Sequence, residues 1–217
     1  MLARPLEILF RNHRLIAVNK PSGLLSVPGR APDMQDSVFT RARTLLPDAT
    51  GPLIMHRLDW ETSGVMLLAL DPDAHRRLGR QFETRTVKKT YIAVLSGIPE
   101  ATEGEITLPI RPDWNRRPYQ IVDHETGREA ITAWHLLSSE SHGGRPRARV
   151  EMKPRTGRTH QLRVHAALGL QLPILGDALY GDKASAPRLL LHAASIEFSD
   201  PIASGSIRLR VEAPVPF

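Results

Sequence analysis

The segment from His56 to Gly64, HRLDWETSG, places a carboxylate beside a guanidinium and an imidazole. The apolar run Val65 to Leu70 follows directly and is typical of a buried strand. A carboxylate at the entrance to a rigid strand can be held in one orientation, as a nucleophile or general base requires. Asp59 is therefore a candidate catalytic residue. The alternative is a structural aspartate that caps a turn or pairs with Arg57.

The segments before this motif must help to position it. Residues 8–10 and 15–19 are predicted to form two short strands around a polar turn. Residues 20–30 contain two prolines and two glycines, which is the composition of an ordered loop. Two interpretations of this loop stay open. It is a plain connector, or it runs along a ligand with Lys20 and Arg30 at its ends.

Two helices are predicted from their caps. Asp36 or Ser37 caps the first, which ends at Pro47, and Asp71 followed by Pro72 begins the second. The apolar residues of both segments recur at helical spacing, so each helix should bury one face. These residues are Val38, Ala42, Leu45 and Leu46 in the first helix and Ala74, Leu78 and Phe82 in the second.

A third helix is predicted to run from Thr159, as its cap, to a stop at Gly169. Arg158 would lie at its entrance and Arg163 within it. A helix N-terminus and guanidinium groups attract an anion. We therefore expect this segment to face a phosphate or the catalytic carboxylate.

The rest of the chain is predicted to be mainly strand. Residues 129–137 and 147–152 should be joined through a hairpin connection around residues 141–144. No repeat, low-complexity tract or long linker interrupts the chain, so residues 1–217 are predicted to form one domain. The other strands are expected at 88–95, 103–110, 189–198 and 207–211.

Basic and aromatic residues indicate RNA as a partner. The 29 Lys and Arg residues exceed the 23 Asp and Glu residues, giving a net charge of +6, and guanidinium groups make forked contacts with phosphate. Tyr91 follows two lysines in a predicted strand, where it either stacks on a base or packs inside the protein. The segment 111–119 interleaves arginines with Trp114 and Tyr119, a mixture that suits looped RNA.

Several kinds of site lack their sequence signatures. The chain has no cysteine, which excludes disulfides, thiolate catalysis and iron–sulfur clusters. It contains no phosphate-binding glycine loop, no H-E-x-x-H and no G-x-S-x-G. Neither a signal peptide nor an apolar run of roughly 20 residues is present. We expect a cytoplasmic protein in which a zinc site or a nucleotide cofactor lacks support from the sequence.

Three motifs in order resemble the RluA-type RNA pseudouridine synthases: Lys20-Pro21-Ser22-Gly23, the His56 to Gly64 segment, and Gly157 to His165. The resemblance extends over about residues 8–213. It implies an α+β fold, with a single catalytic domain built on a curved, mostly antiparallel mixed sheet with flanking helices and loops. Longer members carry an S4-like N-terminal domain, which is not expected here because the catalytic region begins within ten residues of Met1.

The resemblance also implies a reaction. The C1′–N1 glycosidic bond of a uridine breaks, the uracil turns in place, and C5 joins C1′. The resemblance implies that this reaction needs no metal and no organic cofactor. Residues 24–30, 113–118 and 187–193 resemble in particular the compact member that acts on two RNA classes. The implied targets are uridine 32 of a tRNA anticodon stem-loop and uridine 746 of 23S rRNA, and the alternative is another tRNA or rRNA uridine.

A monomer is expected, because no long exposed apolar helix or strand is evident.

Roles for single residues follow from the same resemblance. Asp59 matches the catalytic aspartate, and Arg163 matches the arginine that pairs with it. Tyr91 matches the tyrosine that stacks on the target base. Arg57 matches a residue that enters the RNA where the uridine is flipped out, which offsets part of the cost of extrusion. The other residues expected to contact the substrate are His56, Arg30, Lys89, Arg158, Leu190 and Leu191.

The route that Asp59 takes stays open. It attacks C1′, removes the C2′ proton to give a glycal-like intermediate, or adds to C6 of the ring. One carboxylate suffices for the first two routes, unlike the carboxylate pair of ordinary glycoside hydrolysis.

Two other functions compete with the isomerase. A nucleosidase or glycosidase using Asp59 and Glu61 would release free uracil or sugar, and a non-catalytic RNA-binding protein would tolerate Asp59→Asn.

Overall fold

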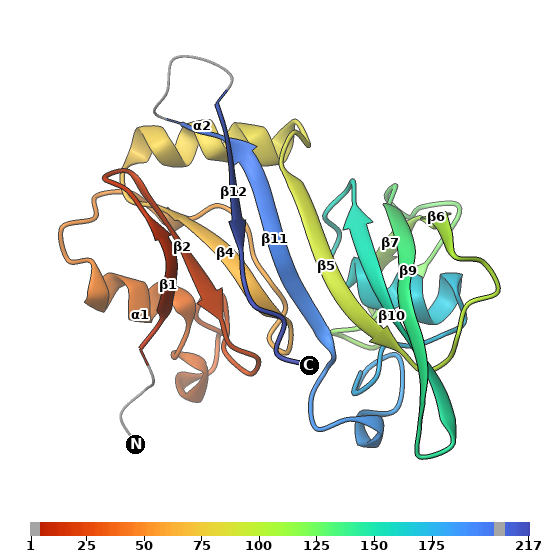
Figure 1. Ribbon diagram of the computed structural model, residues 1–217. Coiled ribbons are helices and arrows are strands. Elements are labelled where there is room, and N and C mark those ends of the chain that lie inside the picture. Colours follow the sequence, from red (N-terminus) through yellow and green to blue (C-terminus); the bar gives the residue numbers. More distant parts are fainter. Residues whose placement is uncertain (1–4, 202–206) are drawn as a thin grey trace. The chain divides into compact units, whose positions relative to one another are not determined.

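The computed structural model describes residues 5–201 and 207–217 (Figure 1). The chain forms two compact units: the first comprises residues 1–88 and 193–216, and the second comprises residues 89–192 with Phe217. Strand pairing is mostly antiparallel and the helices are few, so the predicted α+β class is confirmed. That the two units act as one catalytic domain stays a prediction.

The first unit is built around β4 (Ser63–Ala69), the predicted buried strand after the HRLD motif. β2 (Leu15–Lys20) pairs antiparallel with β4 and with β1 (Glu7–Arg11), which confirms the two predicted N-terminal strands. β4 also neighbours β11 (Leu191–Ser199), of which residues 193–199 belong to this unit. Two further strands complete the sheet: β3 (Leu53–Ile54) beside β4, and β12 (Arg208–Glu212) beside β11.

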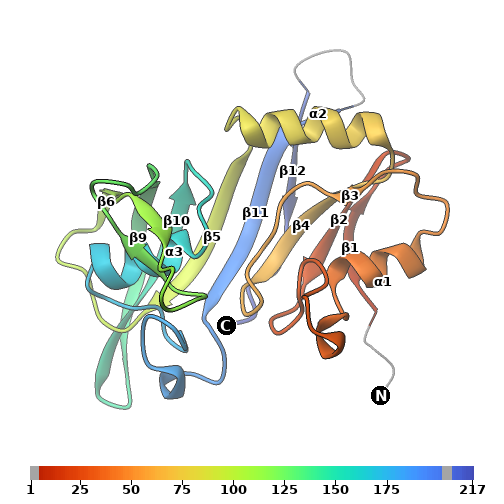
Figure 2. The same ribbon diagram turned by 180° about the vertical axis from the view of Figure 1, so that it is seen from behind.

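β4 is buried along its whole length because alternate side chains enter two different cores. Val65 and Leu67 pack in one core with residues of α2 (Pro72–Glu83), and Met66 and Leu68 pack in the other with residues of α1 (Val38–Leu45). A strand covered on both faces is continuously apolar, as this one is. Both helices are visible from behind in Figure 2.

The caps of α1 and α2 are those that the sequence predicted. Ser37 and Thr40 form a reciprocal capping box at the start of α1, and the Asp71 side chain accepts a hydrogen bond from the Ala74 amide of α2. Gly64 allows a close approach at the start of β4. It has a φ of +117°, and a Cβ there would lie 2.2 Å from the backbone oxygen of Ala193.

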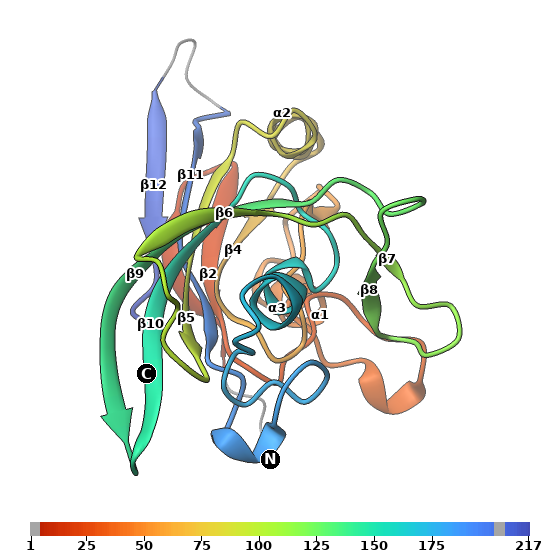
Figure 3. The same cartoon turned by 90° about the vertical axis from the view of Figure 1, so that its right-hand side faces the viewer.

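The second unit contains β5 (Lys88–Leu95), β10 (Arg145–Pro154), β9 (Ile131–His142) and β6 (Glu103–Thr107), paired antiparallel in that order. β9 and β10 form a long hairpin, seen from the side in Figure 3. Its two-residue turn is made by Gly143 and Gly144, both with positive φ, which confirms the predicted connection. The strands are longer than predicted and reach the turn itself.

Two local predictions in this unit are wrong. The expected strand at 103–110 is two strands, β6 and β7 (Ile110–Pro112), and β7 pairs instead with β8 (Gln120–Val122). Pro109, which has no amide hydrogen to donate, lies between them. Thr159 does not cap the third helix, because α3 (Gln161–Val164) begins after His160, which has a φ of 53°.

In the described part of the chain, the start of α3 has no side-chain cap, and the side chain of Gln161 instead holds the loop before the helix. Its Oε1 accepts hydrogen bonds from the Arg158 amide at 2.9 Å and from the Thr156 hydroxyl at 2.7 Å. After Val164 the chain continues in a wider π-helical turn, residues 165–169, to the predicted stop at Gly169. Two short 3₁₀ turns complete the elements, Pro32–Met34 in the first unit and Lys183–Ser185 in the second. Of the helices in residues 5–201 and 207–217, none has the length and apolar content to cross a membrane.

Candidate active site

Asp59 lies in the turn that leads from β3 into β4 in the first unit. Its backbone oxygen accepts a hydrogen bond from the Thr62 amide at 3.2 Å, which closes the turn. The Asp59 side chain is half-buried, Leu58 before it is buried, and Arg57 and Trp60 are exposed. The turn therefore presents Asp59 and Arg57 to the outside while Leu58 anchors it in the protein.

Lys20 holds this turn from the preceding loop. Its side chain is 0% exposed, and its Nζ donates to three backbone oxygens: those of Leu24 at 2.6 Å, Pro21 at 3.0 Å and Trp60 at 3.0 Å. A buried ammonium group is tolerated only when its donors are satisfied, and three carbonyl acceptors match its three donors. Lys20 thus ties residues 20–24 to the residue directly after Asp59.

Five more hydrogen bonds join residues 20–26 to residues 58–61. The Ser22 hydroxyl donates to the Glu61 oxygen at 2.7 Å, and the Gly23 amide donates to the Trp60 oxygen at 3.0 Å. The Trp60 indole donates back to the Gly23 oxygen at 2.7 Å. Ser26 lies against Leu58, donating to its oxygen at 2.7 Å and accepting from its amide at 3.0 Å.

The loop at 20–30 is therefore not a plain connector. Its first half fixes the backbone on both sides of Asp59, a role that sequence reasoning missed. The expectation that Lys20 faces a ligand is wrong, because the ammonium is buried against carbonyl oxygens. The only hint in the sequence was a lysine between a strand and a Pro-Ser-Gly turn. Arg30 is exposed, and its predicted contact with the substrate stays a prediction.

His56 is held within the first unit. Its ring stacks on Phe82 of α2 with centroids 4.6 Å apart, and its Nε2 accepts a hydrogen bond from the Leu67 amide at 2.9 Å. These contacts fasten the start of the HRLD motif to β4 and α2. The predicted contact of His56 with the substrate stays a prediction.

Thr62 carries an unusual hydroxyl. It is 3% exposed, and among the described residues its Oγ1 is a buried side-chain atom without a hydrogen-bond partner. Burying an unpaired hydroxyl is costly, and native proteins seldom keep one without a reason. Thr62 lies three residues after Asp59, and its backbone amide closes the turn that carries the candidate catalytic group.

The other predicted site residues lie in the second unit. Tyr91 on β5 is half-buried against the core of this unit, and the nearby Lys89 donates its Nζ to the Thr156 oxygen at 3.2 Å. Leu191 is 2% exposed and belongs to that core, whereas Leu190 is only partly buried and packs against it. Leu190 is therefore the more accessible of the two leucines.

Arg163 of α3 is nearly fully buried and makes a two-point ion pair with Asp177. Its Nε lies 2.8 Å from Oδ2 and its Nη2 lies 2.6 Å from Oδ1. The Asp177 carboxylate also accepts the backbone amides of Leu179 and Tyr180. Burial works against its ionisation, but the Arg163 guanidinium and these amides hold the pKa of Asp177 below its usual range.

Tyr180 extends this network. The Arg163 guanidinium lies 5.4 Å from the centre of its ring. Its hydroxyl accepts the Gln120 amide at 2.7 Å and lies 2.9 Å from His160 Nδ1. Asp177 and Tyr180 were both missed at the level of sequence. The available signal was an aspartate and a tyrosine in the otherwise apolar segment 173–181.

Arg158 donates its Nε to the Glu129 oxygen at 3.0 Å. Its predicted phosphate contact, and the predicted pairing of Arg163 with Asp59, stay predictions. The structure thus groups the site residues by unit: Arg30, His56, Arg57 and Asp59 in the first, and Lys89, Tyr91, Arg158, Arg163, Leu190 and Leu191 in the second.

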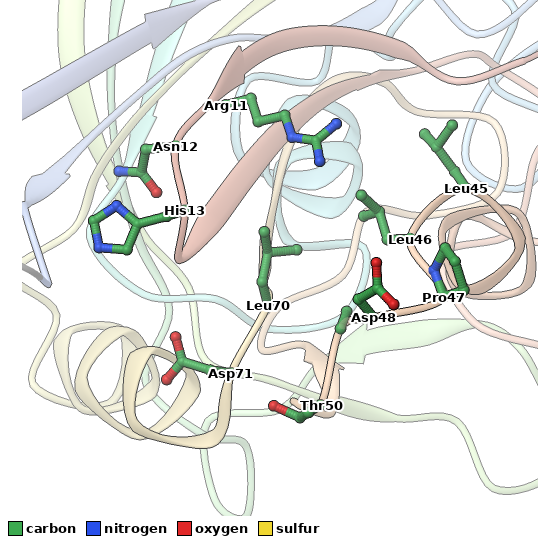
Figure 4. A pocket seen from close by; sticks show the side chains of 11 residues that line it. Arg11, Asn12, His13, Leu45, Leu46, Pro47, Asp48, Thr50, Leu70 and Asp71 are labelled. Atoms are coloured by element: carbon green, nitrogen blue, oxygen red, sulfur yellow. The ribbon is translucent and has the colours of Figure 1, made fainter.

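A separate cavity of about 480 Å³ lies at the turn between β1 and β2 (Figure 4). Leu70 at the far end of β4 contributes to it, so the strand separates it from the Asp59 turn by roughly 20 Å. This cavity is not the candidate active site. Its lining mixes both signs of charge: Arg11, Asn12, His13, Leu45, Leu46, Pro47, Asp48, Ala49, Thr50, Leu70 and Asp71. Within the described ranges, no group of three or more His, Asp or Glu side chains is arranged to hold a metal ion.

Known proteins resemble this chain in sequence over most of its length. The family model for RNA pseudouridylate synthase matches residues 14–168. The dual-specificity RNA pseudouridine synthase RluA of Yersinia pestis is 46% identical over 209 residues, covering 95% of this chain and 98% of the relative. The protein of the same name from Escherichia coli strain K12 is 45% identical over 211 residues, covering 96% of this chain and 93% of the relative.

A solved structure shares the fold as well. Human RNA pseudouridylate synthase domain containing 1 superposes with a TM-score of 0.79 at 29% identity, over 98% of this chain and 84% of the human chain. The matched family region contains the Asp59 turn, the loop that fastens it, and Arg163. The chain belongs to the RNA pseudouridylate synthase family.

Proposed function

We propose that Asp59 is the catalytic carboxylate of this RNA pseudouridine synthase, acting with Tyr91 and Arg163. The observation that carries the proposal is the way the Asp59 turn is held. Lys20 and Ser22 bind the backbone after Asp59, and Ser26 binds the residue before it. A group fixed in this way needs little reorganisation to reach a reacting atom, which is the condition for an efficient nucleophile or base.

The reaction is an isomerisation, so nothing is added to the RNA or removed from it. The C1′–N1 bond breaks, the C5–C1′ bond forms, the C5 proton is lost and N1 gains a proton. Asp59 attacks C1′ or takes the C2′ proton in the two routes that a single carboxylate can serve. Arg163 pairs with the Asp59 carboxylate and Tyr91 stacks on the uracil, roles that rest on the family resemblance.

The proposed substrates are a tRNA anticodon stem-loop and 23S rRNA. The names of the relatives from Yersinia pestis and Escherichia coli, which describe dual specificity, support this choice, as does their near full-length match. In both RNAs the target uridine is flipped out of the helix, and the exposed Arg57 enters the space it leaves. The enzyme acts as a monomer in the cytoplasm, where both RNAs are found.

The test is incubation of the purified protein with an unmodified anticodon stem-loop and with a 23S rRNA fragment, followed by base-resolved detection of pseudouridine. The wild type should convert one uridine in each RNA, and Asp59→Asn should convert none. Asp33→Asn changes an exposed aspartate of the same unit and should behave as the wild type. Conversion by Asp59→Asn, or release of free uracil, would overturn the proposal for Asp59. Conversion of other RNAs alone would overturn the choice of substrates.

A further inference from the structure

We propose that Trp114 and Arg117 form a stacking platform for one unpaired base of the RNA substrate, distinct from the target uridine. The platform would set which RNA loops the enzyme accepts. The inference rests on RNA being the substrate and names a second place where that RNA is recognised.

Trp114 is the most exposed large apolar side chain described in the second unit, at 63%. The Arg117 guanidinium lies over its ring, 4.7 Å from the guanidinium carbon to the ring centroid. This contact orients the indole and adds positive charge beside it. An aromatic plane held by a cation is the arrangement with which proteins stack on a single-stranded base while attracting its phosphate.

The turn that carries the platform is held by its own hydrogen bonds. The largely buried Asp113 accepts hydrogen bonds from the Asn115 amide at 3.1 Å and from Arg116 Nε at 3.0 Å. The Asp113 amide donates to the Tyr119 oxygen at 2.9 Å, closing the turn between β7 and β8. A preformed turn pays less ordering entropy when a ligand binds. An exposed tryptophan on a rigid turn is therefore suited to binding rather than to filling a gap.

The platform is also tied to the candidate active site. Tyr180 accepts the Gln120 amide at the start of β8 through its hydroxyl, and its ring lies beneath the Arg163 guanidinium. His160, directly before α3, contacts the same hydroxyl. The turn and Arg163 are thus parts of one connected network in the second unit. A base stacked on Trp114 would be held at a fixed place relative to Arg163.

The charge of this turn favours RNA over an apolar partner. Arg116 lies over the Tyr119 ring at 5.6 Å, so the turn carries a second guanidinium–aromatic pair. Two arginines and two aromatics therefore lie within the six residues 114–119. An apolar protein surface would gain from the indole but not from two guanidinium groups, whereas a nucleotide uses both.

The test measures RNA binding separately from isomerisation. In the Asp59→Asn background, Trp114→Ala should weaken binding of the anticodon stem-loop by roughly 5- to 100-fold, and Trp114→Phe should recover most of the loss. Leu137→Ala changes another exposed apolar residue of the same unit and should leave binding unchanged. Because no turnover is measured, a failure of the assigned catalytic role of Asp59 would not affect this result.

The base itself is found with stem-loops in which one loop nucleotide at a time, other than the target, is abasic. At one position, removing the base should weaken binding to the Asp59→Asn protein. The same abasic RNA and the intact RNA should bind equally to the protein that carries both Asp59→Asn and Trp114→Ala. Wild-type affinity in the Trp114→Ala protein would overturn the proposal. A loss of binding in Trp114→Ala that no abasic position reproduces would also overturn it. The same holds if both Trp114→Ala and Trp114→Phe bind RNA more weakly and melt at a lower temperature, because the tryptophan would then act through stability.

Discussion

Arg163 and Asp177 form a buried ion pair in which two guanidinium nitrogens face two carboxylate oxygens, with the side chains 3% and 0% exposed. The arginine that the family resemblance assigns to catalysis is thus positioned by a partner that is not in any of the three recognised motifs. A guanidinium held at two points keeps its plane fixed, so Asp177 and the Tyr180 ring determine where the Arg163 charge points.

We expect Asp177→Asn to lower the free energy of unfolding by about 3–5 kcal/mol, because it breaks a buried two-point ion pair by removing the charge of one partner. Urea denaturation measures this change. Asp182→Asn alters an exposed aspartate close by and should cost less than about 1 kcal/mol. Equal stability of the Asp177 and Asp182 variants would show that Arg163 is balanced by another group.

Acid should destabilise the fold in two ranges of pH. Burial lowers the pKa of His165 in the folded protein. As the pH falls, the unfolded chain therefore takes up a proton on this imidazole at a higher pH than the folded chain does. Stability is lost as the pH falls below about 6.5, the ordinary pKa of histidine. The pKa of Asp71 is held well below its usual range, mainly by its hydrogen bonds with Arg14, and that of Asp177 is also lowered. Stability from these carboxylates is complete above their unfolded pKa of about 3.8 and is lost below it.

The free energy of unfolding measured from pH 8 to pH 2 checks both ranges. Asp71→Asn should show a smaller loss below pH 4 than the wild type, and the same loss between pH 7 and pH 5. A curve that is flat down to pH 4 would contradict the assignment to His165.

Thr62→Val should separate stability from activity. Valine has nearly the shape of threonine but no hydroxyl, so removing an unpaired buried group should leave the protein as stable as the wild type or up to about 1 kcal/mol more stable. We expect the rate of pseudouridine formation to fall, since a costly buried hydroxyl is retained in the turn that carries Asp59. Thr62→Ser keeps the hydroxyl and should keep the rate. Full activity of the valine variant would refute a role for Thr62 in the reaction.

Lys20→Met should remove the three hydrogen bonds that the Lys20 ammonium donates to backbone oxygens. At about 1 kcal/mol for each lost hydrogen bond, the free energy of unfolding should fall by about 3 kcal/mol. Because one of these oxygens belongs to Trp60, kcat should fall more than KM rises for the RNA substrate. Lys183→Met, which changes an exposed lysine, is the control. Unchanged stability in Lys20→Met would mean that water satisfies these carbonyls.

Much of the local structure followed from sequence because its causes are local. The caps at Ser37 and Asp71 bond to amides three residues away, and the Gly143-Gly144 turn needs only two residues with positive φ. The same reasoning failed at Thr159. There the Gln161 side chain accepts the Arg158 amide before the helix, and it is itself held by Ile131 and Thr132 of β9, about thirty residues earlier.

By itself the sequence determined the class of the fold, the strand that follows Asp59 and the family, and it named candidate residues for the reaction. Tertiary structure decided how those residues are held. Lys20 donates a hydrogen bond to Trp60, forty residues later in the chain, and Asp177 pairs with Arg163, fourteen residues earlier. A pattern of residue types encodes which face of an element is apolar, but the partner of a buried charge is chosen only when distant segments pack and water is removed.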